Sequence, residues 1–294
     1  MSMLLIRGRF KVEGGPKPDG DTLPFIPDDV ADWKLVPGGQ VVPGADGRAS
    51  IRLEGIDALE THYGQEPAPV DHQPRPLAHE AADELLKTLG FGTVLRDDDE
   101  TLATVPDSVP GWILTRGADA YGRCVAFVGR GTPPVYSGYW TGVSARLLER
   151  TANHRLLERG LAYPAFYSGL PVYLRELLTE AAEKARASAA GVWAVDRTLQ
   201  GFPVTGKKSI THDREGAVIL PKLFRRLKDY LDFTGDPSPS ADCFRAFLAG
   251  AADEYRLLPD TKRLYRGLHH IVEVTPDNIV RMTRSCREIV FTEK

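Results

Sequence analysis

The sequence predicts an α+β protein, with a small β-barrel and attached helices in the first two thirds of the chain and a mainly α-helical accessory part after it. Three observations carry this prediction: short alternating segments between turn residues, apolar stripes at helical spacing, and a change of pattern near Gly201-Phe202-Pro203. A chain of 294 residues is long enough for about two domains. We therefore expect a barrel domain over residues 1–203 and an accessory domain over residues 204–294.

Alternating apolar residues beside turn residues define the expected strands. Residues 4–12 and 49–56 have this pattern, and residues 111–128 have the pattern of a hairpin that turns at Gly117-Ala118-Asp119. The intervening residues 24–47, 62–76 and 131–141 are expected to form long surface loops.

Apolar stripes define the expected helices. Residues 77–89 carry such a stripe and stop at Gly90, a residue suited to a left-handed helix cap. Further helices are expected over residues 144–159 and 170–190. In the accessory part we expect helices over residues 218–231 and 241–255, separated by the breaker cluster 234–239, and a hairpin over residues 271–282.

Charge and cysteine content limit the class of protein. The formal net charge is -3, and it is unevenly distributed: residues 207–294 hold 16 Lys+Arg against 13 Asp+Glu, which leaves 21 against 27 before them. An acidic barrel would attract a polyanion poorly, so nucleic-acid binding would have to be local or metal-assisted. The apolar run after Met1 is too short for a signal peptide, and no stretch suits a membrane span. The three scattered cysteines favour a cytoplasmic protein.

Three segments carry residues suited to phosphodiester chemistry. The first, Asp19-Gly20-Asp21-Thr22, is a carboxylate-rich turn that could bind a hard cation. The second runs from Arg52 to Glu60 and includes Asp57, and the third is Asp119-Ala120-Tyr121-Gly122-Arg123. Together they supply carboxylates for a metal and a water molecule, and arginines for a phosphate.

In this order, the segments resemble those of the thermonuclease (staphylococcal nuclease) family. Two later segments extend the resemblance over about the first 200 residues: Asn153-His154-Arg155-Leu156 with Gly160-Leu161-Ala162, and Gly191-Val192-Trp193. The resemblance implies an OB-type barrel with attached helices. It also implies a calcium-dependent endonuclease or phosphodiesterase that acts on DNA or RNA and leaves 3′-phosphate ends.

The resemblance also assigns roles to individual residues. Asp21, Asp57 and the carbonyl of Ala58 would bind calcium, flanked by Asp19 and Thr22. Glu60 would position or activate the attacking water, and Arg52 and Arg123 would bind the phosphate. The residues expected to contact the substrate are aromatic: Tyr121, Tyr163, Phe166 and Tyr167.

One departure from the family pattern and several alternatives accompany this interpretation. The family has proline where this chain has Leu59, which could loosen the backbone that aims Glu60. A barrel without catalytic activity that binds nucleic acid or a protein partner is the main alternative, because OB folds also serve as binding modules. The accessory part could recruit a protein partner.

Two groups of basic residues in the accessory part are interpreted as ordinary surface residues and not as a nucleic-acid site or a metal site. Lys222, Arg225, Arg226 and Lys228 have the pattern of a solvated basic helix face, and His269-His270 that of a helix surface. A chain ending near Thr205 should fold if the accessory part is a separable module. It should aggregate if residues 218–231 pack on the barrel.

Overall fold

A closed five-stranded β-barrel forms the first half of the chain in the computed structural model, which describes residues 2–64, 70–96, 102–235, 240–251 and 253–292. Its strands follow one another around the barrel in the order β1, β2, β3, β8, β7, and β1 pairs with both β2 and β7 to close it. The bounds are β1 Ser2–Lys11, β2 Thr22–Pro27, β3 Ala49–Leu53, β7 Ser108–Ala118 and β8 Cys124–Arg130. This arrangement, in which only β3 and β8 run parallel, is consistent with an OB-type fold.

The sequence allows the barrel to close because small residues stand where its strands approach most closely. Gly8 of β1 lies opposite both Pro27 and Gly111. A side chain at Gly8 would bring its Cβ within 2.1 Å of the Ile26 carbonyl oxygen. The interior is filled by aromatic rings such as Phe10 and Phe127, which are fully buried. The strand predicted over residues 4–12 and the hairpin over 111–128 are confirmed. The single strand predicted over residues 49–56 is interrupted, because a turn at Glu54-Gly55 separates β3 from β4 (Ile56–Ala58).

Part of one predicted loop is a strand. Residues 24–27 belong to β2, which occupies a central place in the barrel because it pairs with both β1 and β3. The pattern Thr22-Leu23-Pro24-Phe25-Ile26-Pro27 contains two prolines, which obscured its strand character. In the loop predicted over residues 62–76, residues 65–69 lie outside the described part of the chain. The other strands of this half are β4 Ile56–Ala58, β5 Thr93–Arg96, β6 Leu102–Val105, β9 Trp140–Gly142, β10 Ala162–Pro164 and β11 Phe166–Tyr167.

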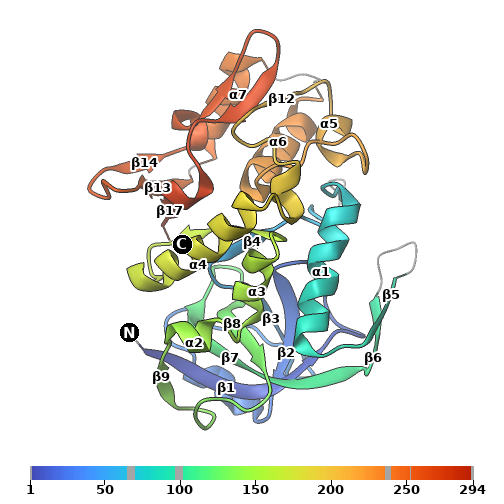
Figure 1. Cartoon of the computed structure of the whole chain (residues 1–294), viewed down its shortest axis with the longest axis vertical. Coiled ribbons are helices and arrows are strands. Elements are labelled where there is room, and N and C mark those ends of the chain that lie inside the picture. The colour runs from blue at the N-terminus through green and yellow to red at the C-terminus, as the bar shows by residue number, and fades with distance from the viewer. Residues whose placement is uncertain (1, 65–69, 97–101, 236–239, 252, 293–294) are drawn as a thin grey trace.

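The helices of this half lie around the barrel, with α1 along one flank, α2 beside β7, and α4 toward the C-terminal elements (Figure 1). Helix α1, Arg75–Leu89, buries the predicted stripe and ends at Gly90, whose φ of 107° confirms the left-handed cap. The helix predicted over residues 144–159 is two helices, because the Thr151 hydroxyl caps the start of the second. The bounds are α2 Ala145–Leu148, α3 Ala152–Glu158 and α4 Val172–Ala187, with short 3-10 helices at Val30–Leu35 and Gly191–Ala194.

The two glycine segments of the family-like pattern interlock at the ends of α3 and α4. Gly160 and Gly191 have φ angles of 69° and 54°, and the Gly160 carbonyl accepts a hydrogen bond of 2.8 Å from the Val192 N–H. A Cβ on Gly191 would lie 2.2 Å from the Gly160 carbonyl oxygen. Both positions therefore exclude larger residues for steric reasons and because of their left-handed backbone.

Replacing Asn153 with alanine is expected to destabilise the barrel strongly. The side-chain oxygen accepts a hydrogen bond from Val128 N–H (2.9 Å), and the amide nitrogen donates to the carbonyls of Glu54 (2.9 Å) and Ala126 (3.1 Å). Lost hydrogen bonds to buried groups cost about 1–3 kcal/mol each, so the free energy of unfolding should fall by about 3 kcal/mol or more. Urea unfolding measures this, with His154→Ala as the neighbouring control. A loss below about 1 kcal/mol for Asn153→Ala would contradict the role of this amide.

The part of the chain after residue 204 combines helices with short strands. Its helices are α5 Lys208–Thr211, α6 Pro221–Thr234 and α7 Ala241–Gly250, with 3-10 helices at Leu268–His270 and Cys286–Glu288. The strands of this part and the segment just before it are β12 Phe202–Pro203, β13 Glu254–Leu257, β14 Leu264–Arg266, β15 Val272–Val274, β16 Ile279–Met282 and β17 Ile289–Phe291. The hairpin over residues 271–282 is confirmed by β15 and β16. The mainly helical prediction underestimated the strand content, because strands of three or four residues carry little periodic signal.

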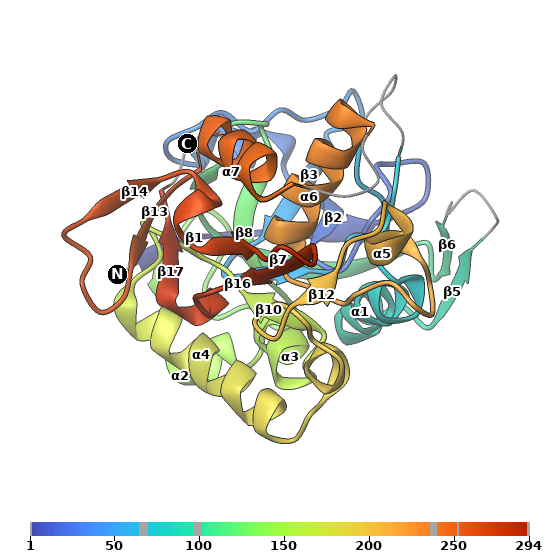
Figure 2. The same ribbon diagram turned by 90° about the horizontal axis from the view of Figure 1, so that it is seen from above.

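The C-terminal elements lie over one end of the barrel in both views (Figures 1 and 2). They share a hydrophobic cluster with the first part of the chain, in which Leu59 and Tyr163 pack with Phe224 and Leu227 of α6. Strand β17 also pairs in parallel with β11. Residues on both sides of the boundary predicted near residue 203 therefore pack in the same cluster. No helix in the described ranges is both long and apolar enough to cross a bilayer.

Candidate functional site

The residues singled out by the sequence pattern converge at the end of the barrel that faces α6. The turn before β2 supplies Asp19 and Asp21, the end of β3 supplies Arg52, and β4 and the residues after it supply Asp57 and Glu60. Gly20 allows this convergence because a Cβ there would lie 2.5 Å from the Cβ of Ala58. The tight turn between β3 and β4 depends on Gly55, whose φ is 79°.

Hydrogen bonds fix the two aspartates predicted to bind calcium. Asp21 is 6% exposed, and its carboxylate accepts hydrogen bonds from the Thr22 hydroxyl (3.0 Å) and from Ala58 N–H (3.3 Å). The Asp19 carboxylate accepts from Asp21 N–H at 3.0 Å. Asp57 is 2% exposed and lies 3.6 Å from Nη2 of Arg52. Asp19, Thr22 and Ala58 therefore all support the position of Asp21.

An arginine from the C-terminal part completes the cluster. Nη2 of Arg225, on α6, donates to both carboxylate oxygens of Asp57 at 3.1 and 3.0 Å, and Nη1 donates to Oε1 of Glu60. The Arg225 side chain is only 16% exposed. We call Asp19, Asp21, Asp57, Glu60, Arg52 and Arg225 the acidic cluster.

Four carboxyl groups face two guanidinium groups, and their pKa values reflect this imbalance. Burial, opposed by Arg225 and reinforced by Asp21 and Asp57, raises the pKa of Glu60 to about 7. Burial and the charges of Asp21 and Glu60 also raise the pKa of Asp19 well above its usual range. The pKa of Asp57 shifts in the opposite direction. Burial alone would raise it, but the charges of Arg225 and Arg52 together lower it below its usual value. The cluster therefore carries more potential negative charge than its arginines neutralise.

In this arrangement the cluster does not fit a calcium ion. Within the described ranges, no three Asp, Glu, His or Cys side chains are grouped so that they could hold a metal. Calcium requires six to eight oxygen ligands at about 2.3–2.6 Å, whereas both Asp57 oxygens face Arg225.

Arg123 lies on the outer face of the barrel but outside the acidic cluster. It belongs to the same face of the β3–β8 pair as Arg52, because Arg52 lies opposite Val125. Its guanidinium is bound by Asp119, with Nη2 at 2.7 Å from Oδ2, and packs over the ring of Tyr121 at 5.6 Å. Tyr121 is 84% exposed, so its ring is available to a ligand, although the tight turn keeps it beside Arg123.

The other predicted substrate-binding aromatics differ in their accessibility. Tyr163 and Phe166 are 1% exposed, and the Tyr163 hydroxyl donates to Asp196 at 2.9 Å. Both rings form part of the core. A nucleic-acid base could stack on them only if the rings moved out of the core. Tyr167 is half-buried and lies under the guanidinium of Arg52 at 5.8 Å. Tyr167 is therefore the aromatic residue of this set that borders the acidic cluster.

Two residues of the site lacked a recognisable sequence signal. Gln73 is fully buried in the segment predicted as a loop, where its side-chain oxygen accepts from Glu60 N–H (3.2 Å) and its backbone N–H donates to the Glu60 carbonyl (2.9 Å). Its amide nitrogen also donates to the Ile219 carbonyl at 2.8 Å. Leu59, the residue before Glu60, is 1% exposed and belongs to the shared cluster. After Gln73, Arg225 is the second residue of the site whose role the sequence did not indicate.

The predicted basic face of α6 is largely paired within the protein. Lys228 is 2% exposed and binds Asp232 at 2.7 Å. Lys222 and Arg226 both bind the buried carboxylate of Asp253, at 3.0 and 2.7 Å. The solvated interpretation was wrong for this face, because Asp253 packs against Lys222 and Arg226 and Asp232 of the same helix binds Lys228.

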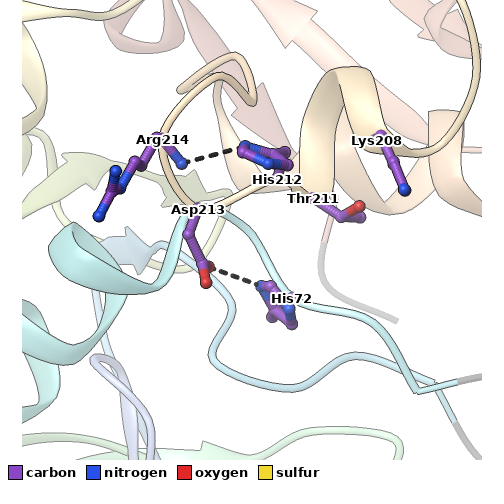
Figure 3. A pocket seen from close by; sticks show the side chains of 6 residues that line it. All are labelled: His72, Lys208, Thr211, His212, Asp213 and Arg214. Carbon is purple, nitrogen blue, oxygen red and sulfur yellow. Dashed lines mark hydrogen bonds and ion pairs between the residues drawn. The ribbon is translucent and has the colours of Figure 1, made fainter.

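A concavity of about 380 Å³ lies beside the start of α1 and is lined by His72, Lys208, Thr211, His212, Asp213 and Arg214. Figure 3 shows Lys208 and Arg214 on opposite sides of it, with Asp213 directed toward His72. Because these basic groups do not point to a common position, we place the candidate site at the acidic cluster.

We compared the sequence with protein-family models and with curated proteins, and neither comparison gave a match.

Proposed function

We propose that this protein hydrolyses phosphodiester bonds in DNA or RNA, as a calcium-dependent nuclease of the thermonuclease type that leaves 3′-phosphate ends. The main support is that Asp21, Arg52, Asp57 and Glu60, which come from separate segments, gather at one end of the barrel. They are the residues that the family-like pattern assigns to metal, phosphate and water.

The chemistry of these side chains suits the proposed reaction. Arg52 would bind a phosphate oxygen, because a guanidinium forms paired hydrogen bonds with phosphate. Glu60, whose pKa lies near 7, would accept the proton of the attacking water, since a general base works best when its pKa is close to the ambient pH. We assign no step to calcium, because Arg225 holds Asp57 in the arrangement described above.

One observation favours a second candidate, a barrel without catalytic activity that binds nucleic acid or a protein. Arg225 joins Asp57 and Glu60 in a buried ion-pair network, which could serve the fold alone. The two candidates differ in whether Glu60 takes part in chemistry.

Digestion assays separate these candidates. Wild type and Arg225→Gln, each with and without Glu60→Gln, would be incubated with plasmid and single-stranded oligonucleotides in calcium, magnesium or chelator. We expect cleavage in calcium, 3′-phosphate ends, and a loss of on the order of 100-fold or more with Glu60→Gln. If none of the four proteins cleaves, or if Glu60→Gln cleaves at an unchanged rate, the proposed reaction is wrong. Nucleic-acid binding without cleavage would then support the binding module.

A further inference from the structure

The ion pairs of Arg225 connect the C-terminal part to the candidate catalytic residues. Arg225 lies 168 residues from Asp57 and 165 from Glu60 along the chain, yet its guanidinium contacts both carboxylates. Asp57 is a predicted calcium ligand, and both of its carboxylate oxygens accept hydrogen bonds in this contact.

The charge of Asp21, at this end of the barrel, acts on Arg52 and Arg225 without a direct ion pair. Asp21 is almost fully buried, and its carboxylate forms no ion pair with any residue that the structure describes. Arg52 is shared between Asp57, at 3.6 Å, and the ring of Tyr167. The cluster thus holds more carboxyl groups than arginines, which would attract a further cation, but both oxygens of Asp57 and one oxygen of Glu60 already accept hydrogen bonds from Arg225.

We infer that Arg225 is an internal competitor of the divalent cation, so that the docked guanidinium keeps the site closed to metal. This inference rests on the proposed function, because it takes Asp57 as a metal ligand. Calcium at Asp57 would lie beside the guanidinium that now binds both of its oxygens, and two cations at so short a distance repel each other. Binding of either cation therefore weakens the binding of the other.

The exchange requires movement of one side chain and leaves the helix in place. Leu223, Phe224 and Leu227 are fully buried and hold α6 in the shared core. Arg225 projects from that fixed helix on a long, flexible stem, so its guanidinium can leave the carboxylates by rotation about side-chain bonds. The closed state thus depends on the hydrogen bonds of one side chain to Asp57 and Glu60, within an otherwise unchanged fold.

Calcium titration calorimetry on the full chain tests this competition in the absence of nucleic acid. Arg225→Gln removes the charge, and Arg225→Lys keeps the charge but loses the two-pronged geometry. Arg226→Gln is the matched control, because the neighbouring guanidinium binds Asp253 outside the cluster. Thermal unfolding verifies that each variant is folded.

We expect Arg225→Gln to bind calcium at least tenfold more tightly than wild type, which lies within the usual range of coupling between sites. Arg225→Lys should be intermediate and Arg226→Gln unchanged. Adding Asp57→Asn to Arg225→Gln should abolish the gain. If folded Arg225→Gln binds calcium no more tightly than wild type, or not at all, the competition does not exist.

This experiment separates the inference from the proposed function. A calcium affinity that rises in Arg225→Gln supports the competition even when no nucleic acid is cleaved. Conversely, cleavage that depends on Glu60 together with unchanged calcium affinity leaves the hydrolytic function standing and removes Arg225 as a competitor.

Discussion

A chain that ends at Thr205 should fail to accumulate as a stable monomer. Removal of α6 would expose Leu59 and Tyr163, which are 1% exposed and pack in the core shared with α6. Burial of a large apolar side chain contributes about 1.5–3 kcal/mol, and α6 alone buries several. The loss would therefore be comparable with the whole stability of a typical domain, about 5–15 kcal/mol.

Size-exclusion chromatography and thermal unfolding of the shortened chain measure this effect, with the full chain as reference. We expect aggregation or an unfolded profile. Limited proteolysis of the full chain provides an independent measurement, and residues 202–216 should resist cleavage because Phe202 and Ile210 are buried. A stable, soluble fragment after cleavage there would show that the first 200 residues fold alone.

Arg52→Ala should produce the largest loss of cleavage among the cationic residues. Its guanidinium is 13% exposed and lies beside Asp57, whereas Arg123 is bound to Asp119 outside the acidic cluster. Loss of a contact that stabilises the transition state costs about 3 kcal/mol, or on the order of 100-fold in turnover. Folding should survive, because Arg225 still neutralises Asp57.

Steady-state kinetics at saturating metal provide the measurement, with Arg123→Ala and Arg226→Ala for comparison. Arg123→Ala is expected to cost less than Arg52→Ala because its side chain already has a partner. Arg226→Ala should lower stability through the loss of its bond to Asp253 and leave turnover unchanged. Equal losses for Arg52 and Arg123 would mean that Arg123 leaves Asp119 during the reaction.

The elements predicted correctly are those whose signal is local. The stripe of α1 with its Gly90 cap and the alternation of β1 lie within about 15 residues, where backbone preferences and burial act together. Strand β2 was missed because prolines replaced the expected alternation. The short strands after residue 250 depend on their partners, since three-residue segments such as β17 have no period of their own.

In the candidate site, too, the residues with a local sequence signal were predicted and the residues that act through distant contacts were not. The ordered motifs identified Asp21, Arg52, Asp57 and Glu60, and the turn and strand geometry around Gly20 and Gly55 brings them together. Arg225 and Gln73 could not be predicted, because their roles depend on contacts across 165 and 13 residues with no local pattern. Tyr163 is likewise buried in a cluster that includes residues of α6, a helix that comes much later in the sequence.

The long separation between Arg225 and the carboxylates affects how the protein folds as it is synthesised. The last barrel strand, β8, ends at Arg130, so all five barrel strands are synthesised before α6. Translation of the residues between Arg130 and Arg225 takes roughly 5–20 s at bacterial and eukaryotic rates. During that interval the nascent chain exposes Leu59 and the other apolar residues that later pack with α6, and exposed apolar surface of this kind is what chaperones protect. We therefore expect the late-emerging helix to determine when this protein becomes independent of chaperones.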